Sequence, residues 1–383
     1  MQKQKDIKDF KAGNWVQQLN YKSFLPNKVY LQWILSNPIL LNKLGEADRY
    51  LGRLDAFSEL IPDIDFFIKM HITKEASVSS KIEGTQTSFE EALVKKTDIH
   101  PEKRDDWQEV QNYIKAMNEA INNMEKLPIS NRLIKQTHKT LLQGVRGKHK
   151  LPGEYRSSQN WIGQSLKNPI FVPPTHTEIP NLMQDLEQFI NAELLDLPIK
   201  VPHLIKIALI HYQFETIHPF LDGNGRIGRL LITLYLLDKN LLQKPTLYLS
   251  DYFERNRRDY YDNLTQVRIK NDLENWLLFF LEGVIQTAKK SIQAFKDINQ
   301  LRNKIELNQL ITLGRKQKDA KKLIDLLYKE PIIDAKEIAQ QLNIHISTTN
   351  RLIKDFENLN ILKELTGYKR NRIFAFVEYI NIF

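Results

Sequence analysis

The residues best suited to take part in a chemical reaction form one run of twelve, from His218 to Arg229. Its sequence is His-Pro-Phe-Leu-Asp-Gly-Asn-Gly-Arg-Ile-Gly-Arg. Two glycines, Gly223 and Gly225, flank Asn224, so the backbone can adopt positive φ angles and approach a ligand closely. Consecutive N–H groups in such a turn form a concave binding site for anions. The run therefore predicts a site for the phosphate groups of a nucleotide.

The residues around this turn supply other parts that phosphate chemistry needs. The apolar residues after Gly225 predict a helix whose N-terminus adds partial positive charge at the same place. Arg226 and Arg229 are three residues apart and share a helix face, so both can hold phosphate oxygens. Asp222 is placed to hold Mg²⁺ against these phosphates, and His218 is the candidate general base.

A metal site is the alternative interpretation of the histidines. His211 precedes His218 by seven residues on a similar helix face, and Asp222 could complete a set of three ligands. We disfavour a metal site because it leaves the glycines and arginines of the run without a role. Phe220 is expected to pack rather than to react.

Most of the chain has the periodicity of amphipathic helices, and few segments indicate strands. Residues 1–70 contain several amphipathic stretches separated by prolines, and a helical pattern from Phe66 to Val78 ends near Gly84. Helix-breaking glycines and prolines between 150 and 180 predict a non-helical region, with a short strand or hairpin at Ile170-Phe171-Val172. The fold class is therefore mainly α, with helices expected at 104–126, 181–193, 203–217, 225–239, 256–270 and 272–290.

The C-terminal part has a pattern of its own. Asp334 to Glu337 resembles a capping box, and Ser347 is the expected N-cap of the next helix. The basic residues Lys369, Arg370 and Arg372 then separate two β-rich stretches. Helix, turn, helix and basic hairpin together predict a winged helix-turn-helix. Such a surface is compatible with DNA. Winged helices also serve as protein-binding modules, and the lack of a dense basic cluster here keeps that alternative open.

Composition narrows the class of protein. The 383 residues include 55 Lys+Arg and 46 Asp+Glu, and the net charge of +9 permits nucleotide or DNA partners without requiring them. The absence of cysteine excludes disulfides, thiolate metal sites and a cysteine nucleophile. The charged N-terminus lacks the apolar core of a signal peptide, and the most apolar stretch, 276–285, is too short to span a bilayer. We therefore expect a cytoplasmic protein that does not bind a membrane.

The run from His218 to Arg229 resembles the signature of the Fic family, His-x-Phe-x-(Asp/Glu)-Gly-Asn-Gly-Arg-x-x-Arg, at every specified position. The segment from Ser79 to Gly84, Ser-Ser-Lys-Ile-Glu-Gly, is similar to the inhibitory motif of the family, (Ser/Thr)-x-x-x-Glu-(Gly/Asn). Ser79 and Glu83 are one helical turn apart and share a face. Segments 152–174 and 249–261 are similar to the flap of the family and to the part that follows its signature.

The resemblance implies a protein adenylyltransferase, which transfers AMP from ATP to a hydroxyl side chain of a target protein or of itself. Some members of the family also remove the modification. The implied ligands are ATP and Mg²⁺, with His218 as the base and Asp222 as the metal ligand. Tyr260 is expected either to line the adenine pocket or to pack in the core. The implied phosphate contacts are Gly223, Asn224 and Gly225 for the α- and β-phosphates, Arg226 for the leaving pyrophosphate and Arg229 for the γ-phosphate.

The resemblance also implies regulation and partners. Glu83 is expected to form a bidentate pair with Arg229 and to withdraw it from the γ-phosphate, with Ser79 and Gly84 completing the inhibitory motif. The flap residues expected to pair with the backbone of a target protein are Ile170, Phe171 and Val172. The resemblance further suggests a homodimer.

These predictions divide the chain into four parts: an N-terminal helical region with the inhibitory motif (1–100), a Fic catalytic core (101–290), a linker helix (291–317) and a winged helix-turn-helix domain (318–383). Two alternatives stay open. One is a Fic enzyme that uses another nucleotide donor such as UTP. The other is a DNA-binding regulator whose Fic core senses nucleotide, although a sensor has no need of the base His218.

Overall fold

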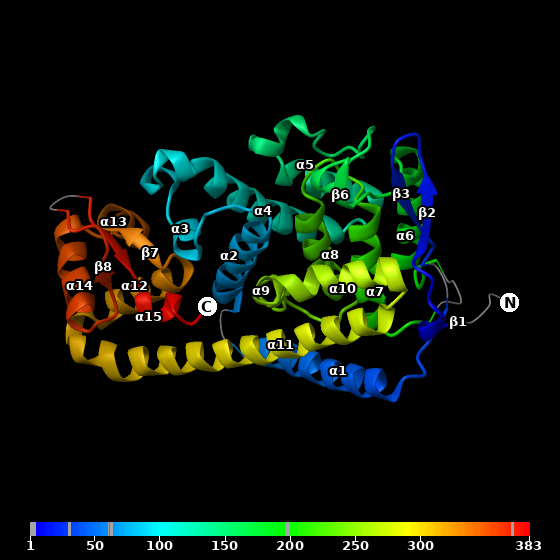
Figure 1. The fold of residues 1–383 in the computed structure, drawn as a ribbon. Helices are drawn as coiled ribbons and strands as arrows, with labels where there is room; N and C mark the ends of the chain where they lie inside the picture. Colours follow the sequence, from blue (N-terminus) through cyan, green and yellow to red (C-terminus); the bar gives the residue numbers. More distant parts are fainter. Residues whose placement is uncertain (1–4, 30–31, 60, 62–63, 196–199, 369–370) are drawn as a thin grey trace.

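The structure is a computed structural model that describes residues 5–29, 32–59, 61, 64–195, 200–368 and 371–383. Within this part the protein is mainly helical, as predicted, with small two- and three-stranded sheets (Figure 1). The helices up to the end of the predicted core are α1 (Pro38–Glu59), α2 (Ile64–Ile82), α3 (Phe89–Leu93), α4 (Arg104–Met124), α5 (Asn131–Leu141), α6 (Ile179–Ile190), α7 (His203–Ile217), α8 (Asn224–Asp238), α9 (Ser250–Arg255), α10 (Arg257–Lys270) and α11 (Leu273–Lys304).

Helix α7 lies at the centre of the core. Every side chain from Leu204 to Ile217 is buried, so α7 is enclosed on all sides rather than amphipathic. Helices α6, α8 and α11 pack against it, and strand β3 contacts it as well. A helix enclosed in this way is a rigid base for residues at its end.

Helix α11 is the long rod that joins the core to the C-terminal elements (Figure 1). It packs along α1, and it continues without a break to Lys304 because its apolar face stays buried as far as Leu301. Irregular helical turns follow at Ile305–Gln309 and Leu310–Lys316. The predicted linker at 291–317 therefore begins inside α11 and ends in these turns.

The N-terminal segment differs from its prediction. The described residues 5–29 and 32–34 form short strands and one 3-10 turn (Ile7–Asp9) instead of amphipathic helices. The strands are β1 (Lys5–Asp6), β2 (Gly13–Gln17), β3 (Lys22–Pro26) and β4 (Trp33–Ile34). Strands β2 and β3 make an antiparallel hairpin with Trp15 opposite Phe24. The Phe24 N–H donates to the Val172 carbonyl oxygen at 2.9 Å. This contact with a segment almost 150 residues away helps to hold the hairpin, and local periodicity cannot reveal it.

The C-terminal elements are α12 (Gln317–Lys329), β7 (Ile332–Asp334), α13 (Ala335–Leu342), α14 (Ile346–Asn358), β8 (Lys363–Glu364), β9 (Ile373–Ala375) and α15 (Val377–Ile380), with strand order β7-β9-β8. Asp334 caps α13 as predicted, accepting from two backbone N–H groups. His345 caps α14, where Ser347 was expected, because its Nδ1 accepts from the Ser347 N–H. Lys369 and Arg370 lie outside the described residues. The winged helix-turn-helix stays a prediction.

Candidate functional site

His218 lies immediately beyond the buried end of α7. Its N–H donates to the Phe214 carbonyl, and its backbone adopts the left-handed conformation with φ 51° and ψ 60°. Pro219 follows and disfavours helical geometry at the residue before it, so α7 must end here. A side chain other than glycine in this region is uncommon and is found where function requires the geometry.

The environment of His218 keeps its imidazole neutral. The pKa of His218 is lowered to about 4, mainly by burial and in addition by the positive charges of Arg156 and Arg268, against smaller opposing contributions from Glu83 and the Glu215 backbone. The ring atom Nδ1 is buried and has no hydrogen-bond partner among the residues that the structure describes. The ring is therefore unprotonated at neutral pH and able to accept a proton.

Two side chains hold the loop after His218 in place. Asn224 reaches back to Phe220, accepting from its N–H and donating to its carbonyl oxygen, each at 2.8 Å. Arg156 is buried and donates to the carbonyl oxygens of His218 and Pro174. The second of these contacts ties the loop to the end of the flap. Asn224 was predicted as a phosphate contact, and the structure shows that its side chain is occupied with the loop.

A histidine from α5 supports the same loop. The His138 Nδ1 accepts from the Gly153 N–H at 2.9 Å, so Nε2 carries the proton and donates to the Asp222 carbonyl at 3.0 Å. Its ring stacks on Phe220 with centroids 3.7 Å apart. Sequence reasoning missed His138, because a contact across more than 80 residues leaves no local pattern.

The anion site was predicted at the start of the helix that is observed as α8. Gly223 has φ 77° and precedes the helix without a side-chain cap, while its N–H donates to Asp222 Oδ1 at 2.6 Å. The first N–H groups of a helix have no partner within it, so those of Asn224, Gly225 and Arg226 are available to a ligand. Asp222 keeps 41% of its side chain exposed beside them.

Arg226 has a different environment from the one predicted. Its guanidinium is 4% exposed and donates to Glu109 of α4 at 3.0 Å and to Asp222 at 3.3 Å. The two carboxylates compensate its charge in the absence of a phosphate, and they link α4 to the start of α8. Glu109 carried no signal of this role in the sequence, because it lies among other buried positions of an ordinary helix.

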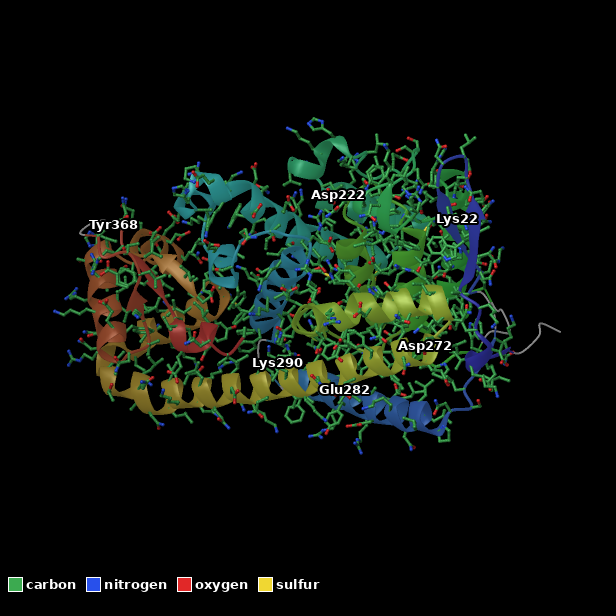
Figure 2. All side chains as sticks on the ribbon, viewed as in Figure 1. Lys22, Asp222, Asp272, Glu282, Lys290 and Tyr368 are labelled. Carbon is green, nitrogen blue, oxygen red and sulfur yellow. The ribbon has the colours of Figure 1, made fainter. Side chains whose placement is uncertain are left out.

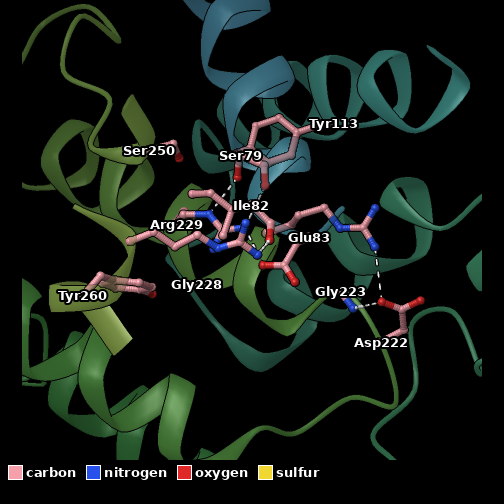
Figure 3. A network of polar contacts seen from close by, with 12 residues as sticks. Ser79, Ile82, Glu83, Tyr113, Asp222, Gly223, Gly228, Arg229, Ser250 and Tyr260 are labelled. Carbon is pink, nitrogen blue, oxygen red and sulfur yellow. Dashed lines mark hydrogen bonds and ion pairs between the residues drawn. The ribbon is translucent and has the colours of Figure 1, made fainter. Parts of the chain in front are cut away.

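Arg229 joins the two motifs, which are about 150 residues apart (Figure 3). Its Nη2 donates to Glu83 Oε1 at 2.7 Å and to the Ser79 carbonyl at 2.9 Å, and its Nε donates to Ser79 Oγ at 2.9 Å. The predicted pairing of Glu83 with Arg229 is present. In the contacts of the described residues Arg229 donates to one oxygen of Glu83 only, so the pair is not bidentate, and Ser79 occupies the Nε edge of the guanidinium.

Glu83 stands directly over the anion site. A Cβ added to Gly225 would lie 2.2 Å from Glu83 Oε1 and 3.0 Å from Arg229 Nη1, so only glycine allows this approach. Burial opposes ionisation of Glu83, but Arg229, followed by Arg226 and His218, lowers its pKa below the usual value. A carboxylate thus occupies the place where the helix favours an anion. Gly84, with φ 102°, follows the end of α2 as predicted.

The structure bears on two predictions that left alternatives open, those for Tyr260 and His211. Tyr260 is 1% exposed, and its hydroxyl contacts His211 Nε2 at 2.9 Å, so the second of its two predicted roles, packing in the core, describes it here. The other nitrogen of His211 lies 3.0 Å from the Gly228 carbonyl oxygen. Because both nitrogens have protein partners, His211 cannot bind a metal together with His218.

The flap is a hairpin of β5 (Ile162–Ser165) and β6 (Asn168–Phe171). Of the three residues predicted to meet a target, only Ile170 is exposed, at 74%. Phe171 is buried, with Arg268 above its ring at 4.0 Å. Val172 is also buried, and its carbonyl accepts from Phe24. The side chains of Phe171 and Val172 therefore anchor the flap, and contact with a target through them would need the backbone.

Buried His211 predicts a loss of stability in acid. Burial lowers its pKa to about 3, although the Gly228 contact opposes this. Unfolding restores a pKa of about 6.5, so the unfolded chain binds the extra proton and stability falls as pH falls below that value. Urea titrations should show that this residue contributes a loss of about 2 kcal/mol between pH 6.5 and 5. Glu215, with a pKa raised by burial to about 7, gains stability of similar size over this pH range and so offsets the His211 loss in the wild type.

His211→Gln removes this titration. The slope of unfolding free energy against pH should become less positive in this variant, even though it is less stable overall. Exposed His100 provides the control, and His100→Gln should keep the wild-type slope. An unchanged slope in His211→Gln would mean that His211 is protonated in the folded protein.

Comparison with known proteins shows which proteins this chain resembles. The sequence profile "Fic/DOC family N-terminal" matches residues 41–122, and the profile "Fic/DOC family" matches residues 128–236. A protein named "Protein adenylyltransferase Fic" from Drosophila grimshawi is 27% identical over 180 residues, which cover 46% of this chain and 33% of that protein. The chain thus spans about a third of the length of that relative.

Solved structures show the same fold. A Fic family protein from Desulfovibrio desulfuricans G20 has a TM-score of 0.56 at 20% identity, covering 89% of this chain and 96% of that one. Fic-1 from C. elegans has a TM-score of 0.52 at 22% identity, covering 69% and 75%. The first similarity extends well beyond the residues that the two profiles match.

No helix in the described part of the chain is long and apolar enough to cross a membrane.

Proposed function

Because this chain belongs to the Fic/DOC family, we propose that it is a protein adenylyltransferase that its own Glu83 holds inactive. It transfers AMP from ATP to Ser, Thr or Tyr hydroxyls of target proteins and of itself. One observation carries the proposal: a neutral imidazole at the end of α7 and the first turn of α8, whose N–H donors have no side-chain cap, bracket a single loop, 218–223.

The site suits a triphosphate that lies across the N-terminus of α8. The α- and β-phosphates bind the N–H groups of Asn224 and Gly225, where helix dipole and donors act together. The γ-phosphate reaches Arg229 once Glu83 has moved away. Arg226 approaches the β-phosphate and exchanges part of its pairing with Asp222 for the phosphate oxygens.

Asp222 fits the single-carboxylate type of magnesium site. No group of three or more His, Cys, Asp or Glu side chains among the described residues could enclose a metal. Mg²⁺ in nucleotide sites needs only one or two carboxylates, because phosphates and water complete its octahedron. The exposed Asp222 beside the phosphate site meets this requirement. Bound there, the ion neutralises charge that develops on the phosphates.

The transfer is a displacement at the α-phosphorus. The hydroxyl oxygen of the target forms the new bond to phosphorus, and the bond from phosphorus to the α,β-bridging oxygen breaks. Pyrophosphate leaves with its electron pair, and His218 takes the proton of the hydroxyl. Since the pKa of His218 is lowered to about 4, the base is ready throughout the neutral range, but it holds the proton only briefly.

Glu83 supplies the inhibition. Its carboxylate occupies both Arg229 and the space above Gly225, so ATP cannot place its γ-phosphate correctly until Glu83 leaves. The same carboxylate also suggests the reverse reaction: beside the phosphate site and near His218, it can orient a water molecule towards an AMP-modified hydroxyl. Loss of label from purified AMP-modified protein in the wild type, but not in Glu83→Gln, would test this second activity.

Labelled nucleotides test the main proposal. The purified protein is incubated with Mg²⁺ and ATP labelled at either the α- or the γ-phosphate, and incorporation into protein is measured on a denaturing gel. We expect label from the α-position only, and none after chelation of Mg²⁺. Label from the γ-position would indicate a kinase. Preferential incorporation from α-labelled UTP would show that the donor is UTP and not ATP. This result would support the alternative of a Fic enzyme that uses another nucleotide donor.

A further inference from the structure

A cavity lies beside α2, between that helix, α9 and α11. It contains about 510 Å³ free of protein atoms, part of which opens to solvent. Lys290, labelled on α11 in Figure 2, lies far from Asp222 in that view, so the cavity is separate from the phosphate site. Its lining residues include His71, Lys74 and Glu75 of α2, Tyr248 and Asp251 from the start of α9, and Ala294 of α11.

Polar atoms in the cavity wall have unused hydrogen-bonding capacity. Glu75 is 3% exposed and Tyr248 is 6% exposed, and neither Glu75 Oε2 nor the Tyr248 hydroxyl has a partner within the described part of the chain. The same holds for His71 Nε2. A buried polar group without a partner is costly, and several around one cavity indicate a polar ligand.

The charges and apolar surfaces narrow the class of ligand. Lys290 donates to Asp251 at 2.9 Å, so that pair is nearly neutral. Lys74 adds a second ammonium group, and its pKa is lowered, chiefly by burial, which favours a compensating anion. Val78, Ala294 and Phe383 provide an apolar wall opposite. The cavity thus suits a compact organic molecule that carries one carboxylate and one hydrogen-bonding group.

A buried hydrogen-bond chain connects the cavity to Arg229, and Figure 3 shows its members Arg229, Ser79, Tyr113 and Ser250. The Arg229 Nε donates to Ser79 Oγ at 2.9 Å, and Ser79 hydrogen-bonds Tyr113. Tyr113 donates to Glu75 Oε1 at 3.1 Å, and Ser250 also donates to this oxygen. The chain ends on the carboxylate whose other oxygen is unpartnered at the cavity. Glu75, Ser79 and Glu83 are spaced one helical turn apart along α2 and just beyond its end.

We propose that this cavity binds a small carboxylic acid, and that the bound acid stabilises the pairing of Glu83 with Arg229. The regulatory half rests on the function proposed above. A ligand favours the state in which its site is best formed, and here the site is formed with Glu83 in place. The carboxylate lies against Lys74, while a hydroxyl meets Tyr248 or Glu75. Binding thus holds α2, with Ser79 and Glu83, against Arg229.

Calorimetric titration tests the site without any activity assay. The probes are benzoate, 4-hydroxybenzoate and phenylacetate, titrated into the full chain. We expect saturable binding of 4-hydroxybenzoate with one site per chain. Tyr248→Phe should weaken it about three- to tenfold, the effect of one hydrogen bond. Lys74→Met should weaken all three probes by roughly tenfold or more, because it removes a charge-assisted contact.

Matched variants separate this effect from general damage. Tyr328→Phe removes an equally buried, unpartnered hydroxyl in α12, outside the cavity. Lys69→Met removes an exposed ammonium on α2 that does not line the cavity. Both should bind the probes as the wild type does. If none of the three probes binds, or if the controls weaken binding as much as Tyr248→Phe and Lys74→Met, the proposed site is wrong.

Self-labelling tests the regulatory half. If only the inhibited state binds the acid, a concentration ten times the dissociation constant should lower self-labelling about elevenfold. Glu83→Gly cannot form the inhibited pairing, so it should bind the acid more weakly than the wild type by calorimetry, and its labelling should not respond to the acid. Calorimetric binding with unchanged wild-type labelling would overturn the regulatory claim and keep the site. No labelling in any variant would count against the proposed function, and calorimetry would still decide the site.

Discussion

Glu83→Gly is expected to raise self-labelling from α-labelled ATP by roughly ten- to a hundredfold. The variant removes a charge-assisted hydrogen bond of 2.7 Å to Arg229, and such a bond contributes about 1.5–3 kcal/mol. Each 1.4 kcal/mol is worth a factor of about ten in an equilibrium constant. The variant also opens the space above Gly225, where the carboxylate now lies. Initial rates of label incorporation at saturating ATP measure the gain.

A matched control distinguishes the loss of this pairing from loosening of a helix end. Glu59 is the last residue of α1 and is exposed, so Glu59→Gly makes the same chemical change at a similar place away from Arg229. It should label at the wild-type rate. Ser79→Ala should give a smaller gain than Glu83→Gly, because the Ser79 carbonyl still accepts from Arg229. Equal labelling in wild type and Glu83→Gly would remove the inhibitory role from Glu83.

His218→Ala, introduced into the Glu83→Gly background, is expected to reduce labelling by about a hundred- to ten-thousandfold, the usual contribution of a positioned general base. The activated background matters because inhibition could otherwise hide the loss. Since the pKa of His218 is lowered to about 4, this base stays unprotonated between pH 6 and 8. Its protonation state should therefore cause little change in the labelling rate of Glu83→Gly over this range. The rate should fall as the pH approaches 4.

Nucleotide binding provides the control for His218→Ala. The phosphate site belongs to the backbone of α8 and to Arg229, so ATP affinity measured by calorimetry should change little. Exposed His176 beside the flap offers a matched substitution, and His176→Ala should label as its parent does. Retained labelling in the double variant would show that another group, or solvent, takes the proton.

Local sequence was enough to predict the chemical parts of the site. Helical periodicity placed His218 just beyond the end of a helix, and the observed α7, His203–Ile217, has the predicted bounds. The flanking glycines placed the start of the next helix within one residue, at Asn224. These features depend on φ preferences and on i, i+3 and i, i+4 spacing, which short stretches of sequence carry directly.

Only the tertiary structure decided which distant groups meet. It brought Glu83 and Ser79 onto Arg229, with Ser79 on the Nε edge of the guanidinium and one Glu83 oxygen on Nη2, and it placed His138 against the loop. The tertiary structure also buries the Tyr260 side chain in the core, and it folds the N-terminal residues into strands. Such contacts join positions 80 to 150 residues apart, and they arise from how enclosed helices pack. A single sequence records the periodicity of each helix, but it does not record which faces of distant helices meet.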